Sequence, residues 1–456
     1  MNQISLSSRI KNRIIIPSIR KFRVWRISAG NLICFSVFII SFSIFSEQDR
    51  RDIASYPIKE LDFRTYLEEV LNNNYELASK KYNVNIAETE IEIAKKIPNP
   101  NLVMGNQSSD ISGKHMPQQW YLGFQGTVEL FGKRAARIDY QTSLADHSRA
   151  MFADYLLQLR ADATITFVNT LAIRLITKRK EASYATLQQL SESTAKRLLS
   201  GDVSELDVTQ ARVEANLMKN ELLSSESDLK GAALNIILFM SRKDTSVLYY
   251  PSGDLNIAPK KYDVEKLIKY ALQRRPDVIA ASYDKVVSKQ NEKLTEANRT
   301  PNFNFEVANN FYTRATNATG PSPSYYAVTY FFGVTLPLSN YWKGDLEQAK
   351  YRISKSEVDY EMTKLKAEVE VKKAYMQYQL ASEQLKIYQT SILADAERVF
   401  QGKLYSYKRG SSTLLDVLAA QKTLNNVYYT YYQDLREYVI KMVELQRSSG
   451  IWEIQI

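Results

Sequence analysis

The hydrophobic positions of this chain follow two different periods, one typical of helices and one typical of strands. Neither glycine nor proline occurs between Lys133 and Ser200, or between Asp345 and Gln401. Because glycine and proline cost about 1 and 3 kcal/mol in a helix interior, this absence predicts two very long helices. At about 1.5 Å per residue they would reach about 100 Å, longer than a globular core requires. The second helix has the heptad period of a coiled coil, with this seam: Val371, Ala374, Tyr378, Ala381, Leu385, Tyr388, Ile392 and Val399.

Four shorter segments alternate with a period of two, at about 101–109, 118–130, 302–314 and 324–338. Segments of about ten residues with one apolar face match transmembrane β-strands, although any one of them also fits a half-buried soluble sheet. Four strands are too few for a closed barrel, which needs about eight. If these strands are transmembrane, several chains must share one barrel. Three chains would give twelve strands, with a hollow tube of helices below them.

The chain contains the same plan twice. Each half begins with a helix, at about 63–97 and 263–298, followed by two strands, a long helix, a glycine turn and a shorter helix. The turns share the pattern G-x4-L-D-V-x2-A, which starts at Gly201 and at Gly410. A motif that recurs at the same place in both halves indicates a tandem duplication. We therefore divide the chain into a signal peptide 1–46, an N-terminal extension 47–60, a first repeat 61–250, a linker 251–261, a second repeat 262–450 and a C-terminal tail 451–456.

The formal net charge of +10 has a different meaning once the charges are located. Seven basic residues and no acidic residue precede position 47, and without them 53 basic residues face 50 acidic ones. A nucleic-acid partner is therefore not expected. About 14 apolar residues, from about 32 to 45, follow this basic start, which is typical of a signal peptide and short for a bilayer span of about 20. A retained membrane anchor is the alternative.

The only cysteine, Cys34, lies inside this apolar stretch. The residue before it, Ile33, is bulky, whereas a lipoprotein cleavage site has a small residue there, so lipid attachment is not expected. Removal of the segment leaves no thiol for a disulfide or a metal site. No other stretch approaches 18 uninterrupted apolar residues, so a mature chain that crosses a membrane is expected to do so as a barrel.

Two further motifs lie where a strand enters a long helix. Residues 129–137 read E-L-F-G-K-R-A-A-R, and residues 336–338 and 343–349 read L-P-L and K-G-D-L-E-Q-A. With the duplicated plan, they resemble the TolC family of outer-membrane efflux proteins, in the CzcC/CusC-like branch paired with heavy-metal exporters. Phe131 departs from the glycine usual in that branch. The resemblance implies a mainly α fold with a transmembrane β part. In the family, a trimeric twelve-stranded β-barrel is continued by a long periplasmic α-helical coiled-coil barrel.

The resemblance also implies roles for residues at the two glycine turns. Tyr407 and Asp207 match an inter-hairpin gating link, and Asp416 matches an acidic ring in the pore, where three carboxylates around one axis favour cations. The alternative for both aspartates is a helix N-terminal charge favoured by the macrodipole. This chain departs from the family pattern at Ala419, where a second pore aspartate can occur, and at Ser412, the position of a gating arginine. The hairpin tips expected to dock the adaptor are Gly201, Asp202, Gly410 and Ser411.

The function implied is passive conduction out of the cell. The implied partners are two more copies of the chain in a homotrimer, a periplasmic adaptor (membrane fusion) protein, an inner-membrane resistance–nodulation–division pump and outer-membrane lipid. Heavy-metal cations are the expected cargo, while multidrug efflux and type I protein secretion remain open. A periplasmic coiled-coil scaffold and an envelope enzyme are the other classes.

Candidate chemistry is sparse in this sequence. We find no catalytic constellation and no phosphate-binding loop of the form G-x4-G-K-[ST], and we expect no cofactor. The histidines are His115 and His147, and neither belongs to an H-E-x-x-H motif. His115 next to Met116 could suggest a metal site, but a solvated loop is the favoured interpretation, so no metal site is predicted.

Overall fold

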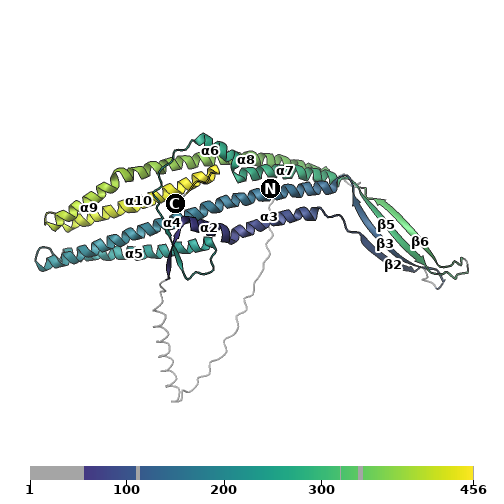
Figure 1. The fold of residues 1–456 in the computed structure, drawn as a ribbon, viewed down its shortest axis with the longest axis horizontal. Helices are drawn as coiled ribbons and strands as arrows, with labels where there is room; N and C mark the ends of the chain where they lie inside the picture. The colour runs from purple at the N-terminus through teal and green to yellow at the C-terminus, as the bar shows by residue number, and fades with distance from the viewer. Residues whose placement is uncertain (1–55, 109–112, 114, 319, 337–342, 455–456) are drawn as a thin grey trace, which may run out of the picture. The chain divides into compact units, whose positions relative to one another are not determined.

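The computed structural model describes residues 56–454, apart from 109–112, 114, 319 and 337–342, and residues 57–454 form one compact unit. The predicted signal peptide, most of the N-terminal extension, and the Pro337–Leu338 part of one motif lie outside the described residues. Figure 1 shows long helices that lead at one end into a β-sheet. The fold is mainly α with a β part, as the sequence predicts.

The four predicted strands are present and form one antiparallel sheet. They are β2 (Asn101–Ser108), β3 (Gln118–Glu129), β5 (Asn302–Tyr312) and β6 (Tyr325–Val334), in the order β2-β3-β5-β6. The central pair, β3 and β5, joins the two repeats of the sequence, with Phe124 opposite Val307. Strands β2 and β6 are the two edges of the sheet.

The register collects the apolar side chains of all four strands on one face. Phe124 lies opposite Leu102 on one side and Val307 on the other, and Val307 lies opposite Tyr330. These side chains are at least partly exposed. The other face carries polar pairs, such as Gln119 Nε2 to Asn310 Oδ1 at 2.8 Å, Thr127 to Asn304 at 2.8 Å and Asn310 to Thr329 at 2.7 Å. The sheet is therefore two-sided, with one apolar face and one hydrogen-bonded polar face.

The helices repeat in the same order in each half. The first half has α2 (Phe63–Asn73), α3 (Tyr75–Ala94), α4 (Lys133–Leu199) and α5 (Glu205–Met240). The second half has α6 (Val264–Arg274), α7 (Pro276–Asn298), α8 (Lys343–Ile387), a π-helix (Tyr388–Ile392), α9 (Leu393–Lys408) and α10 (Leu414–Ser449). Helices α5 and α10 have 36 residues each, as expected from a duplication. A short parallel pair, β1 (Ile58–Asp62) with β4 (Leu248–Ser252), connects the start of the unit to the end of the first repeat.

The sequence predicts one helix at 63–97 and one at 263–298, and both predictions are wrong in the same way. Each segment breaks after eleven helical residues. Asn74 adopts an extended conformation, and its side chain accepts a hydrogen bond from the backbone N–H of Leu77 to cap α3. Arg275 is also extended, because it precedes Pro276, which disfavours a helical conformation at the residue before it.

The long helices pack side by side in the order α3–α4–α7–α8, and beyond them α5 pairs with α4, and α10 with α8, α9 and α4. Two apolar clusters hold these pairs together. The first surrounds Tyr66, Phe167 and Tyr438, and the second lies near the hairpin turns around Leu190 and Phe400. Among the described helices, none is both long and apolar enough to cross a bilayer.

A polar layer separates the two apolar clusters along α4 and α10. Ser183 donates to Asn425 at 2.6 Å, and both side chains are buried. The Arg179 guanidinium lies 3.7 Å from the centroid of the Tyr428 ring. The π-helix Tyr388–Ile392 belongs to the same level of the bundle, because Tyr388 packs against Tyr431 of α10 at 6.3 Å between ring centroids.

The π-helix changes the predicted coiled-coil seam. The seam residues from Val371 to Leu385 are buried as predicted, but Val399 is exposed and the next residue, Phe400, is buried instead. A π-helix accommodates one extra residue in a turn, so every later seam position moves by one. The prediction of Val399 is therefore wrong, and Tyr407, seven residues after Phe400, continues the shifted seam.

Candidate gate at the two hairpin turns

The two glycine turns connect α4 to α5 and α9 to α10, at the ends of these helices that point away from the sheet (Figure 1). Gly201 and Gly410 have φ angles of +79° and +78°, a conformation that favours glycine. Each turn is closed by the same two backbone hydrogen bonds to carbonyls of the preceding helix, one donated by the glycine N–H and one by the next N–H, that of Asp202 or Ser411. This pattern is a standard helix C-cap, so both glycines have an architectural role.

Both aspartates of the repeated motif belong to a helix cap. Ser204 accepts a hydrogen bond from Asp207 N at 3.1 Å, and the Asp207 carboxylate accepts from Ser204 N at 3.1 Å. In the second hairpin, Thr413 and Asp416 form the same capping box. The macrodipole alternative named above is therefore supported in a stronger form, since each aspartate lies in the first helical turn and bonds to the capping residue.

The two oxygens of Asp416 have different neighbours. Oδ2 accepts hydrogen bonds from Ser412 Oγ at 2.9 Å, Thr413 Oγ1 at 3.0 Å and Thr413 N at 3.2 Å. Oδ1 lies 3.6 Å from Nζ of Lys403 on α9. The hydrogen bond from Ser412, followed by those from Thr413, lowers the pKa of Asp416 below its ordinary value, so the carboxylate is ionised at neutral pH.

Tyr407 links the two hairpins of one protomer. Its side chain is buried, and its hydroxyl lies 3.1 Å from the hydroxyl of Thr194 on α4. Arg197, also on α4, stacks on the Tyr407 ring at 4.9 Å and donates to the Tyr407 carbonyl at 3.2 Å. Within the described part of one chain, the Asp207 side chain bonds to its own cap and the Tyr407 hydroxyl to Thr194. A gating role for the two residues stays a prediction.

Comparison with known proteins gives a match to a family model over part of the chain. Residues 267–451 match the model of the outer membrane efflux protein family. This part of the chain is an outer membrane efflux family domain. The chain is 22% identical over 355 residues to the cobalt-zinc-cadmium resistance protein CzcC of Cupriavidus metallidurans, which covers 77% of this chain and 81% of CzcC. The match to the family model places this part of the chain, residues 267–451, among outer-membrane efflux proteins.

Solved structures show the same fold at low sequence identity. CusC, solved in relation to transmembrane channel formation, aligns with a TM-score of 0.71 at 17% identity over 85% of this chain and 92% of CusC. VceC of Vibrio cholerae aligns with a TM-score of 0.68 at 17% identity, over 85% of this chain and 95% of VceC. The open state of the Neisseria gonorrhoeae MtrE channel gives a TM-score of 0.68 at 16% identity, over 85% and 88% of the two chains.

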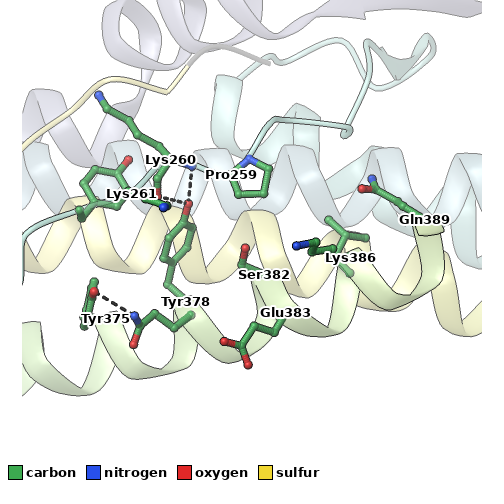
Figure 2. Close-up of a pocket in the computed structure, with 12 residues that line it drawn as sticks. Pro259, Lys260, Lys261, Tyr375, Tyr378, Ser382, Glu383, Lys386 and Gln389 are labelled. Carbon is green, nitrogen blue, oxygen red and sulfur yellow. Dashed lines mark hydrogen bonds between the residues drawn. The ribbon is translucent and has the colours of Figure 1, made fainter.

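A cavity of about 650 Å³ lies between α8 and the segment before α6 (Figure 2). The Tyr378 hydroxyl accepts from the backbone N–H of Lys260 and donates to the Lys260 carbonyl, both at 2.9 Å. At the other end of the cavity, Gln389 of the π-helix donates to Asn256 at 2.8 Å. These bonds attach the segment between the two repeats to α8, so we interpret the cavity as part of that joint.

Metal-binding residues do not gather in the described part of this chain. Among those residues, no group of three or more histidine, cysteine, aspartate or glutamate side chains could hold a metal ion. The sulfur of Met116 accepts a hydrogen bond from Asn317 at 3.5 Å, and His115 adopts a positive φ of 53° in the same loop. This loop geometry agrees with the favoured interpretation of His115 as a loop residue.

Sequence reasoning missed the partners of the candidate gate residues. Ser204 and Thr413 could have been found, because each stands three residues before an aspartate, which is the spacing of a capping box. The contacts of Tyr407 with Thr194 and Arg197 join residues more than two hundred positions apart, and no local pattern indicates them. Lys403 lies on a different helix from Asp416 and is likewise without a sequence signal.

Proposed function

We propose that this protein is the exit duct of a tripartite efflux system, a homotrimer that passively conducts heavy-metal cations across the outer membrane. Its own chain supplies no catalytic step. The energy comes from an inner-membrane resistance–nodulation–division pump, and a periplasmic adaptor docks at the hairpin tips Gly201, Asp202, Gly410 and Ser411. The observation that carries the proposal is that the sheet and the helical layer, as described in one chain, each end in two open edges.

The sheet supports closure with other copies. Its edges are β2 and β6, and each pairs on one side only. Because all neighbouring strands are antiparallel, β2 and β6 run in opposite directions. The β6 strand of one copy can therefore pair antiparallel with β2 of the next. Three copies would close a barrel of twelve strands and leave no open edge.

The helical layer is open at the corresponding places. Its outer members are α3 and α8, and both carry stripes of exposed apolar side chains at helical spacing. On α3 these are Tyr75, Tyr82, Ile86 and Ile93, and on α8 they include Val358, Met362, Leu365 and Val369. Two different complementary edges on one chain give a head-to-tail interface, which forms a ring when the rotation closes.

The cargo assignment rests on charge and on similarity. The proposed constriction lies at the hairpin turn that carries the ionised carboxylate of Asp416, and three copies would form an acidic ring that favours cations. The relative CzcC is a cobalt-zinc-cadmium resistance protein, which favours metal ions. Multidrug efflux and type I protein secretion are the alternatives within the same class.

Two measurements on the detergent-purified protein test this proposal. The native mass, corrected for bound detergent, is expected to equal three chains, and a planar bilayer is expected to show conductance with a cation preference that Asp416→Asn reduces. The asparagine keeps a cap acceptor while removing the charge. A stable monomer or dimer would contradict the shared barrel and favour a periplasmic scaffold. A trimer whose selectivity does not change with Asp416→Asn would support the exit duct but would contradict the placement of Asp416 at its constriction.

A further inference from the structure

The two carboxylate oxygens of Asp416 have different partners. All three hydrogen bonds that the Asp416 carboxylate accepts from Ser412 and Thr413 go to Oδ2. Oδ1 faces Nζ of Lys403, at 3.6 Å. One oxygen therefore belongs to the cap of α10, and the other faces the ammonium group of Lys403.

The lysine is close enough to compensate the charge of Asp416 but is not fixed there. Its side chain is 46% exposed and that of Asp416 is 43% exposed. An exposed ion pair at this distance is weak and is screened by salt, so the ammonium group can move away and return. Lys403 and Asp416 also line one shallow cavity with Arg398, which is itself paired with Asp395 at 3.4 Å. Lys403 is thus the cation that the structure assigns to Asp416.

The first repeat shows that the capping box does not require this lysine. Gly201 and Gly410 are equivalent, and the same spacing makes Thr194 the equivalent of Lys403. Thr194 is buried against Tyr407 and does not serve the cap of Asp207, which is formed by Ser204 alone. Asp207 therefore forms the same cap without a nearby lysine in that position. The presence of Lys403 beside Asp416 needs a different explanation from helix capping.

We propose that Lys403 is a displaceable counter-cation of Asp416, which offsets part of the charge of the acidic ring at rest and yields its place on Oδ1 to a divalent metal cation. In a trimer, three lysines would partly compensate three aspartates, so the resting constriction keeps a reduced negative charge. A divalent cation that reaches Oδ1 competes with one ammonium group and gains from its higher charge. Lys403 then determines how strongly the constriction selects and retains cations. This inference rests on the proposed function, which places Asp416 at the constriction.

The test compares Lys403→Gln with Lys408→Gln, which removes the charge of another exposed lysine on the same hairpin. Reversal potentials in a KCl gradient measure the cation-to-anion permeability ratio, and added Zn²⁺ measures block. We expect Lys403→Gln to raise the permeability ratio and to strengthen Zn²⁺ block several-fold, and Lys408→Gln to change both much less. In an Asp416→Asn background, Lys403→Gln should no longer strengthen Zn²⁺ block, because the carboxylate oxygen that would take Zn²⁺ is absent. Titration calorimetry with Zn²⁺ gives the same comparison without requiring an open pore.

The outcomes separate the two proposals. If Asp416→Asn alters selectivity but Lys403→Gln matches the Lys408→Gln control, Lys403 is an ordinary surface lysine and only this inference is wrong. If Lys403→Gln strengthens Zn²⁺ block equally in the Asp416→Asn background, the lysine works independently of the carboxylate, which also overturns the inference. If Asp416→Asn changes neither conductance nor Zn²⁺ binding, the placement of Asp416 at the constriction fails, and the inference fails with it.

Discussion

At the scale of single residues, the two repeats share one capping box but differ in the side chains around it. Asp207 and Asp416 have the same place in the same capping box, yet their surroundings differ. On the first hairpin, Thr194 and Arg197 contact Tyr407 of the second hairpin, whereas the equivalent of Thr194 on the second hairpin is Lys403, beside Asp416. The two turns share one backbone pattern and one capping box, and the side chains around them differ.

The contact between Tyr407 and Thr194 gives the first prediction at this scale. Tyr407→Phe should weaken the attachment between the hairpins by about 1 kcal/mol, the usual net value of one hydrogen bond. Thr194→Val should do the same, and the double variant should cost less than the sum, because both changes remove one interaction. Thermal unfolding followed by circular dichroism measures the cycle, and the open probability in bilayers should rise in each variant. Additive effects on stability would show that the two hydroxyls do not interact.

The residues of this contact also show which features of the site could be predicted from the sequence and which could not. The glycine of each turn and the aspartates were recognised because they repeat at a fixed spacing. Arg197 stacks on Tyr407 only because α4 and α9 are brought together by the fold, so a single sequence contains no sign of it. Local chemistry was predictable here, whereas the partners of that chemistry were not.

At the scale of elements, the lengths of the helices were predictable and their internal irregularities were not. The absence of glycine and proline predicted α4 almost to its ends, and period-two alternation predicted all four long strands. The π-helix Tyr388–Ile392 contains neither glycine nor proline, so composition does not reveal it. Its only sign is a seam that fails to stay in register, with Phe400 buried where Val399 was expected.

Deleting one residue from the π-helix tests whether it is a one-residue insertion in the coiled coil. Removal of Thr390 should convert the turn to α-helix and leave Phe400 and Tyr407 in the seam, because the extra residue is the one removed. The melting temperature should therefore stay within a few degrees. Deletion of Gln189, an exposed residue of the regular helix α4, should rotate the following segment by about 100° and move Thr194 away from Tyr407. Equal loss of stability in both variants would contradict this interpretation.

At the scale of the whole molecule, the most informative property is what one chain leaves uncovered. The sheet has one apolar face with exposed aromatic side chains, and the helical layer ends in exposed apolar stripes on α3 and α8. Contiguous apolar surface of this kind in a folded chain marks contact with lipid or with another protein. The sequence predicted the apolar strand faces through their alternation. It did not reveal which helices form the edges, since that depends on the packing order α3–α4–α7–α8.

The exposed apolar stripe on α8 gives the last prediction, which tests whether this stripe is a contact between copies of the chain. Burial of a leucine or valine side chain contributes about 1.5–3 kcal/mol, so placing charges at Leu365 and Val369 in three equivalent interfaces should prevent trimer formation. The variant Leu365→Glu/Val369→Glu is expected to retain its helical circular dichroism, because neither side chain packs in the core of its own chain. Its native mass in detergent should fall below that of the trimer. Lys366→Glu on the same helix changes the charge without removing apolar surface, and it should leave the trimer intact. A trimeric Leu365→Glu/Val369→Glu variant would mean that the copies meet along another face, and the pairing of α8 with α3 would have to be abandoned while the shared barrel could still stand.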